Sequence, residues 1–142
     1  MRKASFAFLA ATILIALVAA PVYAQSIRLT ANIPFDFIVG STTMPAGEYT
    51  VDNMLGRKVA RVYNQESGKN VAALFHPSTL PRGVSEGQVS LIFHRYDNTY
   101  FLSKVRDGFT EGLLPITNNE RELKQNAALH MPDETLVVLA QR

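Results

Sequence analysis

The chain has 142 residues, of which 47% are hydrophobic and 18% are charged, and its formal net charge is +2. That length is enough for one folded domain and not for two. Cysteine is absent, which excludes disulfides, a thiolate metal site, a cysteine nucleophile and a lipid-anchored lipoprotein. An exported domain without disulfides indicates a bacterial rather than a eukaryotic secretory route.

The N-terminal segment has the three parts of a secretory signal peptide. Arg2 and Lys3 form a positive n-region, and the apolar run Phe6–Ala20 has the length of an h-region. Small side chains then favour cleavage between Ala24 and Gln25. A spanning helix needs about 20 apolar residues, so this run is too short for an uncleaved membrane anchor. We therefore expect an exported protein, periplasmic or extracellular, with no transmembrane helix in its mature form.

The predicted cleavage divides the chain into a signal peptide, residues 1–24, and a single β-rich domain, residues 25–142. Because Arg2 and Lys3 leave with the signal peptide, the mature domain carries equal numbers of basic and acidic residues. No basic run remains that could follow a phosphate backbone, so nucleic acid is not an expected partner.

Short runs of β-branched and aromatic residues follow. The first spans Ile27–Val39 and is interrupted by Pro34, which predicts an edge strand or a bulge there. After a turn at residues 44–47, Tyr49 and Val51 share one face of a second strand. Turn residues at 53–56 and 66–69 separate two further strands, at 58–64 and 70–76, and residues 77–87 read as the longest loop.

The clearest hairpin joins strands at 88–95 and 100–105 through Asp97 and Asn98, residues that tolerate the positive φ of a type I′ turn. That turn places Arg95 opposite Tyr100, Phe93 opposite Leu102 and His94 opposite Phe101. Strict alternation then puts Val89, Leu91, Phe93 and Leu102 on one face, and Ile92, Phe101 and Val105 on the other. Because both faces are apolar, we expect this hairpin to be central, with Phe93 buried.

One helix is predicted near the C-terminus. Thr117 and Glu120 have the spacing of a capping box, and Leu123 with Ala127 forms a narrow apolar stripe. A last strand, Thr135–Ala140, is continuously apolar and is expected to be buried on both faces. The pattern predicts a mainly β fold: a small antiparallel sandwich or barrel of about seven or eight strands with one short C-terminal helix.

The residues that could carry chemistry do not form a recognisable motif. His76, His94 and His130 lie on separate segments without the close spacing of zinc ligands. No Gly-x-Ser-x-Gly elbow occurs, and Ser90 falls inside a predicted strand. The Asp133–Glu134 and Glu120/Glu122 pairs read as solvated turn and helix faces, and Gly83 and Gly87 lack the Lys-Ser/Thr of a phosphate loop. We therefore expect no catalytic residue, no cofactor and no metal.

Two polar positions allow more than one interpretation. Asp36, between two phenylalanines, is either a binding-site carboxylate at a barrel mouth or an ordinary outward side chain, and alternation favours the second. Arg95 with Tyr96 and Tyr100 is either a cation–π patch at the hairpin tip or the end of an amphipathic strand.

Four segments together resemble a family of small exported proteins abundant in acidobacterial genomes. They are Ile33-Pro34-Phe35-Asp36-Phe37, Pro45-Ala46-Gly47-Glu48-Tyr49-Thr50-Val51, Leu91-Ile92-Phe93-His94-Arg95-Tyr96 with Tyr100-Phe101-Leu102, and Glu120-Arg121-Glu122-Leu123. The likeness covers about residues 30–125 and is weaker over the tail from Pro132 to Arg142. It implies export and a β-rich fold, and it supplies no catalytic residues.

The sequence thus favours a non-enzymatic secreted or periplasmic module that binds a partner or associates with the envelope. A lipocalin-like carrier of a small apolar ligand is the alternative, and a small outer-membrane β-barrel is a further one. The Pro34 interruption and the lack of an outward aromatic girdle count against the membrane barrel. A mature chain of this length barely covers two sheets, so we expect a filled core rather than a ligand cavity.

Overall fold

The computed structural model describes residues 28–52, 58–127, 132–138 and 140–141. The predicted signal peptide with its Ala24–Gln25 cleavage site, the reversal at 53–56 and His130 therefore lie outside the described residues. No helix within the described ranges is long and apolar enough to cross a membrane.

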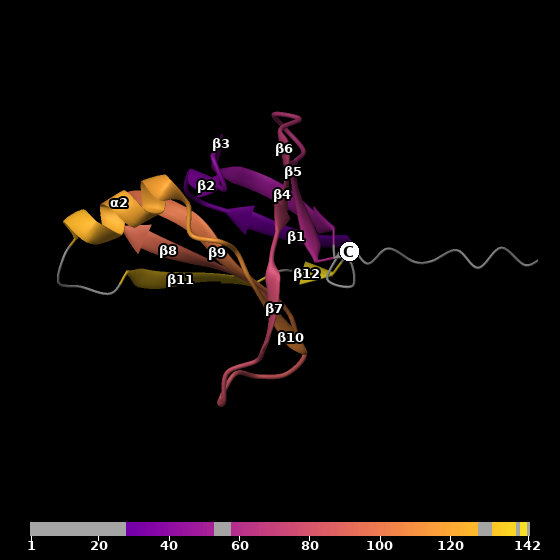
Figure 1. Ribbon diagram of the computed structural model, residues 1–142. Helices are drawn as coiled ribbons and strands as arrows, with labels where there is room; N and C mark the ends of the chain where they lie inside the picture. Colours follow the sequence, from indigo (N-terminus) through magenta and orange to yellow (C-terminus); the bar gives the residue numbers. More distant parts are fainter. Residues whose placement is uncertain (1–27, 53–57, 128–131, 139, 142) are drawn as a thin grey trace, which may run out of the picture.

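The described part of the chain is mainly β, with two sheets and one short helix, α2 (Figure 1). One sheet has the strand order β12-β1-β4-β5-β6, and the other contains β11-β8-β9-β10-β7 with β2 and β3 attached through β9. The elements are β1 Arg28–Ile33, β2 Phe37–Val39, β3 Thr42–Met44, β4 Gly47–Asp52, β5 Val59–Asn64, β6 Asn70–Leu74, β7 His76–Thr79, β8 Val89–Tyr96, β9 Thr99–Asp107, β10 Thr110–Leu113, α2 Asn118–Asn126, β11 Asp133–Val138 and β12 Ala140–Gln141.

The sheets are not purely antiparallel, which corrects the prediction from sequence. Strand β2 runs parallel to β9, with Phe37 opposite Tyr100 and Ile38 opposite Phe101. The reason is that β2 does not fold back on β1. The chain leaves the first sheet after Ile33, passes Pro34 and enters the second sheet at Phe37.

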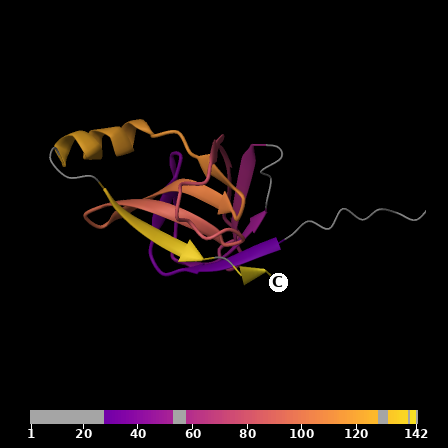
Figure 2. The ribbon, with the colours of Figure 1, turned by 90° about the horizontal axis from the view of Figure 1, so that it is seen from below.

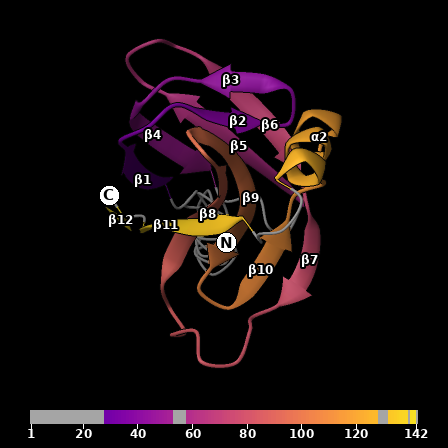
Figure 3. The same cartoon turned by 90° about the vertical axis from the view of Figure 1, so that its left-hand side faces the viewer.

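The chain passes from one sheet to the other between strands that are terminal in their sheets. After β6 the chain passes Phe75 and continues as β7, which belongs to the other sheet, and β11 and β12 are likewise divided between the sheets. The strand pairings together with two chain connections, β6 to β7 and β11 to β12, form a ring: β1-β4-β5-β6, then β7-β10-β9-β8-β11, then β12, which pairs with β1. Strands that switch sheets are typical of curled, barrel-like sandwiches (Figure 3).

The interior of this ring is filled by side chains. Phe37 lies between the rings of Tyr49 and Phe93, with centroid distances of 5.1 and 5.2 Å, and all three are at most 1% exposed. Edge-to-face contacts of this kind add to the stabilisation from burial. The buried cluster comprises Leu29, Ala31, Ile33, Phe37, Val39, Met44, Tyr49, Val51, Ala60, Val62, Ala73, Phe75, Leu91, Phe93, Leu102 and Val105.

The central hairpin β8–β9 has the predicted register up to a bulge. Arg95 pairs with Tyr100, Phe93 with Leu102 and His94 with Phe101. Asp97 has a positive φ of 52° but Asn98 does not, so the predicted type I′ turn was wrong. The register then shifts between Ile92 and Phe93. An extra residue in one strand reverses the alternation beyond it. Val105 consequently joins the interior cluster, and its predicted position on the opposite face was wrong.

Two further predictions are corrected at sheet edges. Residues 77–79 belong to β7 rather than to the predicted loop, and Pro77 pairs with Gly112. Proline is tolerated there because β7 is the last strand of its sheet. Strand β11 is also terminal in its sheet, and Leu136 is 47% exposed. The prediction that this apolar run is buried on both faces was therefore wrong.

Helix α2 has the predicted N-cap Thr117, but the reciprocal half of the capping box is not formed, because the Glu120 carboxylate contacts His94 and Tyr96 instead. The Thr117 hydroxyl accepts a hydrogen bond from the Glu120 backbone N–H, which satisfies one of the free donors of the first turn. Figures 1 and 2 show α2 at one end of the molecule, beside the tip of the β8–β9 hairpin. Of its residues, Glu120 is buried, so the helix contacts the sheet mainly through a carboxylate.

Candidate functional site

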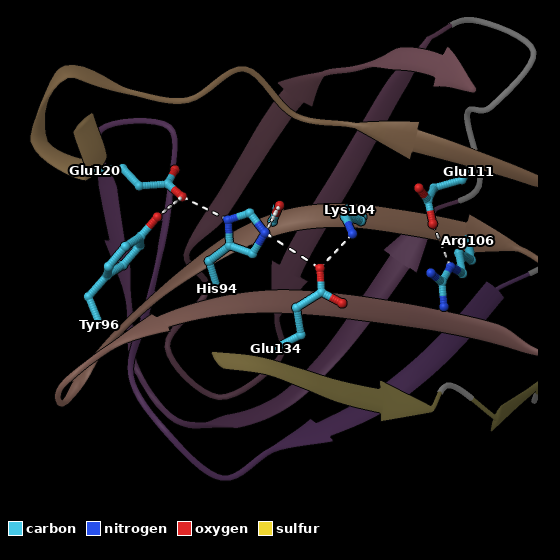
Figure 4. A network of polar contacts seen from close by, with 8 residues as sticks. His94, Tyr96, Lys104, Arg106, Glu111, Glu120 and Glu134 are labelled. Atoms are coloured by element: carbon cyan, nitrogen blue, oxygen red, sulfur yellow. Dashed lines mark hydrogen bonds and ion pairs between the residues drawn. The ribbon is translucent and has the colours of Figure 1, made fainter. Parts of the chain in front are cut away.

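A chain of polar contacts lies on the outer face of the β8–β9 hairpin, the face opposite the interior cluster (Figure 4). Its centre is His94, whose Nδ1 is 3.0 Å from Glu120 Oε1 and whose Nε2 is 3.0 Å from Ser103 Oγ. Tyr96 donates its hydroxyl hydrogen to the same Glu120 oxygen at 3.3 Å. We call Tyr96, Glu120, His94 and Ser103 the His94 network.

The strands explain why these groups meet. His94 and Tyr96 are two residues apart on β8 and therefore point to the same face. Ser103 lies at the register shift of β9, where the bulge turns its hydroxyl toward His94. A carboxylate only accepts hydrogen bonds, so the Nδ1 proton of His94 points to Glu120, and Nε2 remains available to Ser103.

Burial affects the tyrosine of this network. Tyr96 is 6% exposed. Desolvation, reinforced by the nearby Glu120 carboxylate, raises the pKa of Tyr96 to about 12. Both causes disfavour a phenolate, so the hydroxyl stays protonated and remains a donor to Glu120 over the whole physiological range.

The row of charges continues along the same face. Glu134 of β11 accepts a hydrogen bond from Lys104 Nζ at 2.6 Å and lies 3.7 Å from His94 Nε2. The Lys104 contact lowers the pKa of the Glu134 carboxyl. Farther along, Arg106 Nε donates to Glu111 Oε2 at 2.6 Å, and both residues are buried. Each of these charged side chains thus has a partner of opposite charge, and in the buried pair Arg106–Glu111 this partner offsets the cost of burying a charge.

The order Glu120–His94–Ser103 repeats the acid–His–Ser order of nucleophilic serine sites. The setting of Ser103 differs from theirs. It is 8% exposed and lies within a strand, whereas such a nucleophile stands exposed on a sharp turn. The geometry therefore favours a structural role, in which the His94 network holds α2 against the sheet.

A second feature is an open groove on the other sheet. Side chains that point outward from β4, β5 and β6 enclose about 810 Å³ there, within the range of about 300–1,000 Å³ typical of ligand sites. We call it the β4–β6 groove. Its lining residues are Thr50, Asp52, Arg61, Tyr63, Gln65, Asn70 and Ala72.

A smaller groove of about 480 Å³ separates the hairpin tip from α2, and Arg95 and Tyr96 line part of it. Of the two interpretations of Arg95, Tyr96 and Tyr100, the contacts favour the end of an amphipathic strand over a cation–π patch. Arg95 Nη2 donates to Asp133 Oδ2 at 3.0 Å, and the Tyr100 ring stacks on Phe35 at 3.9 Å. The side chains at the hairpin tip therefore hold neighbouring segments of the sheet together.

The remaining candidates are dispersed. His76 is an exposed strand end, and Asp36 is exposed with its Oδ1 accepting the Ala46 N–H at 2.7 Å. Ser90 is buried in β8, where its hydroxyl has no hydrogen-bond partner among the described residues. In the described part of the chain, no three His, Asp or Glu side chains are grouped as metal ligands.

One residue of the His94 network was misread from sequence. Glu120 was expected on a solvated helix face together with Glu122, but it is 4% exposed. The local spacing identified the role of Glu120 in the helix cap. It did not identify the residues that the Glu120 carboxylate contacts, His94 and Tyr96, which lie on β8. Comparisons with protein-family models, curated proteins and solved structures gave no match.

Proposed function

We propose that this protein is an exported, non-enzymatic module of the cell envelope or its surroundings, which binds a ligand through its outer surface at the β4–β6 groove. One observation carries the proposal. The interior is occupied by packed side chains such as Phe37, Tyr49 and Phe93, whereas the groove on the opposite side of β4 and β5 is open and polar.

Export is the part that the sequence supports, through Arg2, Lys3 and the run Phe6–Ala20. The resemblance to small exported proteins of acidobacterial genomes supports it as well. The lipocalin-like alternative requires interior space for an apolar ligand. The interior cluster favours surface binding over that carrier function.

The proposal is tested by native mass spectrometry of the protein purified from its own envelope. We compare the wild type with Ala72→Arg, which adds a long side chain to an exposed position in the groove. Thr43→Arg is the matched control, because Thr43 is an exposed strand residue outside the groove. We expect a bound ligand that is lost in Ala72→Arg and kept in Thr43→Arg. A ligand retained by both variants, or by none of the three proteins, contradicts the proposal.

A further inference from the structure

The β4–β6 groove has balanced charge. Among the described residues, its charged lining residues are Asp52 and Arg61, and their side chains approach to 3.8 Å. Nucleic acids and anionic lipid surfaces are bound through clusters of unpaired basic residues. The charge of this groove therefore fits a neutral ligand.

The groove lies on the face of a sheet, across β4, β5 and the terminal strand β6. Val62 of β5 pairs with Val51 on one side and with Val71 on the other. The backbone N–H and C=O groups of β5 are therefore already hydrogen-bonded to the neighbouring strands. An extended peptide is usually captured at a free edge, where main-chain hydrogen bonds provide the affinity. A ligand of the β4–β6 groove must instead be recognised by side chains.

Those side chains offer many hydrogen bonds and one ring. Thr50, Gln65 and Asn70 supply hydroxyl and amide groups, and the Gln65 amide is oriented by donating to Thr50 Oγ1 at 2.8 Å. Tyr63 is 40% exposed, and such a ring combines a flat apolar surface with a polar tip. A sugar has the complementary combination of hydroxyl groups around its edge and apolar C–H groups on its ring faces.

We propose that the β4–β6 groove binds a neutral oligosaccharide chain, with a sugar ring against Tyr63 and its hydroxyl groups bonded to the polar rim. This inference rests on the proposed function, because it names the ligand class of the same groove. Ala72 is the small residue of the lining; it pairs with Arg61 on the neighbouring strand, diagonal to Tyr63, and leaves space there for a sugar ring.

The test is calorimetry of the exported protein with three neutral hexasaccharides: cellohexaose, laminarihexaose and the β-1,4-linked hexamer of N-acetylglucosamine. We expect at least one to bind with a Kd below about 1 mM. Tyr63→Ala should weaken that binding at least about tenfold, and Tyr63→Phe, which keeps the ring, less than about threefold. Phe109→Ala is the matched control, because Phe109 is 74% exposed outside the groove, and it should leave the Kd unchanged.

Urea melts of all variants establish that each is folded, and Ala72→Arg tests the groove even if Tyr63→Ala is unstable. The inference is overturned if none of the three sugars binds, or if binding is the same in Tyr63→Ala and Ala72→Arg as in the wild type. If native mass spectrometry finds a ligand that is lost in Ala72→Arg but is not a saccharide, this inference fails and the proposed function stands. If no ligand depends on the groove, both fail.

Discussion

His94 Nδ1 and Glu120 Oε1 are 3.0 Å apart, although 26 positions separate the two residues in the chain. One belongs to the central hairpin and the other to the first turn of α2, and both are largely buried. Because Glu120 is the buried residue of α2, this contact couples the position of the helix to the outer face of the hairpin.

Removal of the Glu120 carboxylate should loosen α2. In Glu120→Ala, the buried His94 ring nitrogen and the Tyr96 hydroxyl lose their acceptor, which costs about 1–3 kcal/mol of the free energy of unfolding. Glu122→Ala, at an exposed position of the same helix, should change it by less than about 0.5 kcal/mol. Urea melts and hydrogen exchange of α2 measure both effects. Equal stability of the two variants would show that the His94 network does not hold the helix.

The contribution of Glu134 to stability should disappear in acid. Its pKa is lowered in the folded state by the hydrogen bond from Lys104. The stabilisation is therefore fully present above the unfolded-state pKa of about 4.3 and is lost as the pH falls through the lower folded-state value. Urea melts of wild type and Glu134→Gln should differ near neutral pH and converge below about pH 4. A difference that is constant with pH would refute this assignment.

Phe93 should be essential to the core. It is fully buried and contacts the rings of Phe35 and Phe37. Phe93→Ala is expected to cost about 3–5 kcal/mol, a large share of the total of about 5–15 kcal/mol of a domain. Asp97→Ala, at the exposed turn with φ of 52°, should cost only about 1–2 kcal/mol. If the urea midpoint of Phe93→Ala is close to that of wild type, the hairpin is peripheral.

Gly112 should tolerate no side chain while Phe75 is present. A Cβ at this position would lie 2.4 Å from the Phe75 ring, and Phe75 is the buried residue between β6 and β7. Gly112→Ala should therefore cost about 1–3 kcal/mol through overpacking. The same substitution in a Phe75→Ala background should cost much less, since the obstructing ring is gone. Additive effects in this double-mutant cycle would argue against a direct clash.

Processing should release a mature protein that begins at Gln25. The n-region, the apolar run Phe6–Ala20 and the small side chain of Ala24 are the features that a signal peptidase requires. N-terminal sequencing of the exported form provides the measurement, and Ala24→Asp, which places a charge at the cleavage position, is expected to block release. An exported form that retains Met1 would contradict the prediction.

Local signals in the sequence were sufficient for several features. The Asp97 turn established the register of Arg95 opposite Tyr100, and Thr117 identified the start of α2. Each depends on backbone conformation or hydrogen bonding within a few residues, which the residue types specify directly. The alternation of Tyr49 and Val51 likewise identified two residues of the core.

What the sequence did not determine depends on contacts between distant segments. The parallel pairing of β2 with β9, the edge positions of β7 and β11 and the bulge that brings Val105 inward are set by which strands meet in the ring. Glu120 combines a feature that the sequence predicted with one that it did not. Its backbone N–H follows the local rule of the helix cap, whereas its carboxylate is buried because folding brings His94 and Tyr96 to it. Burial and long-range pairing are properties of the folded chain, and local spacing does not contain them.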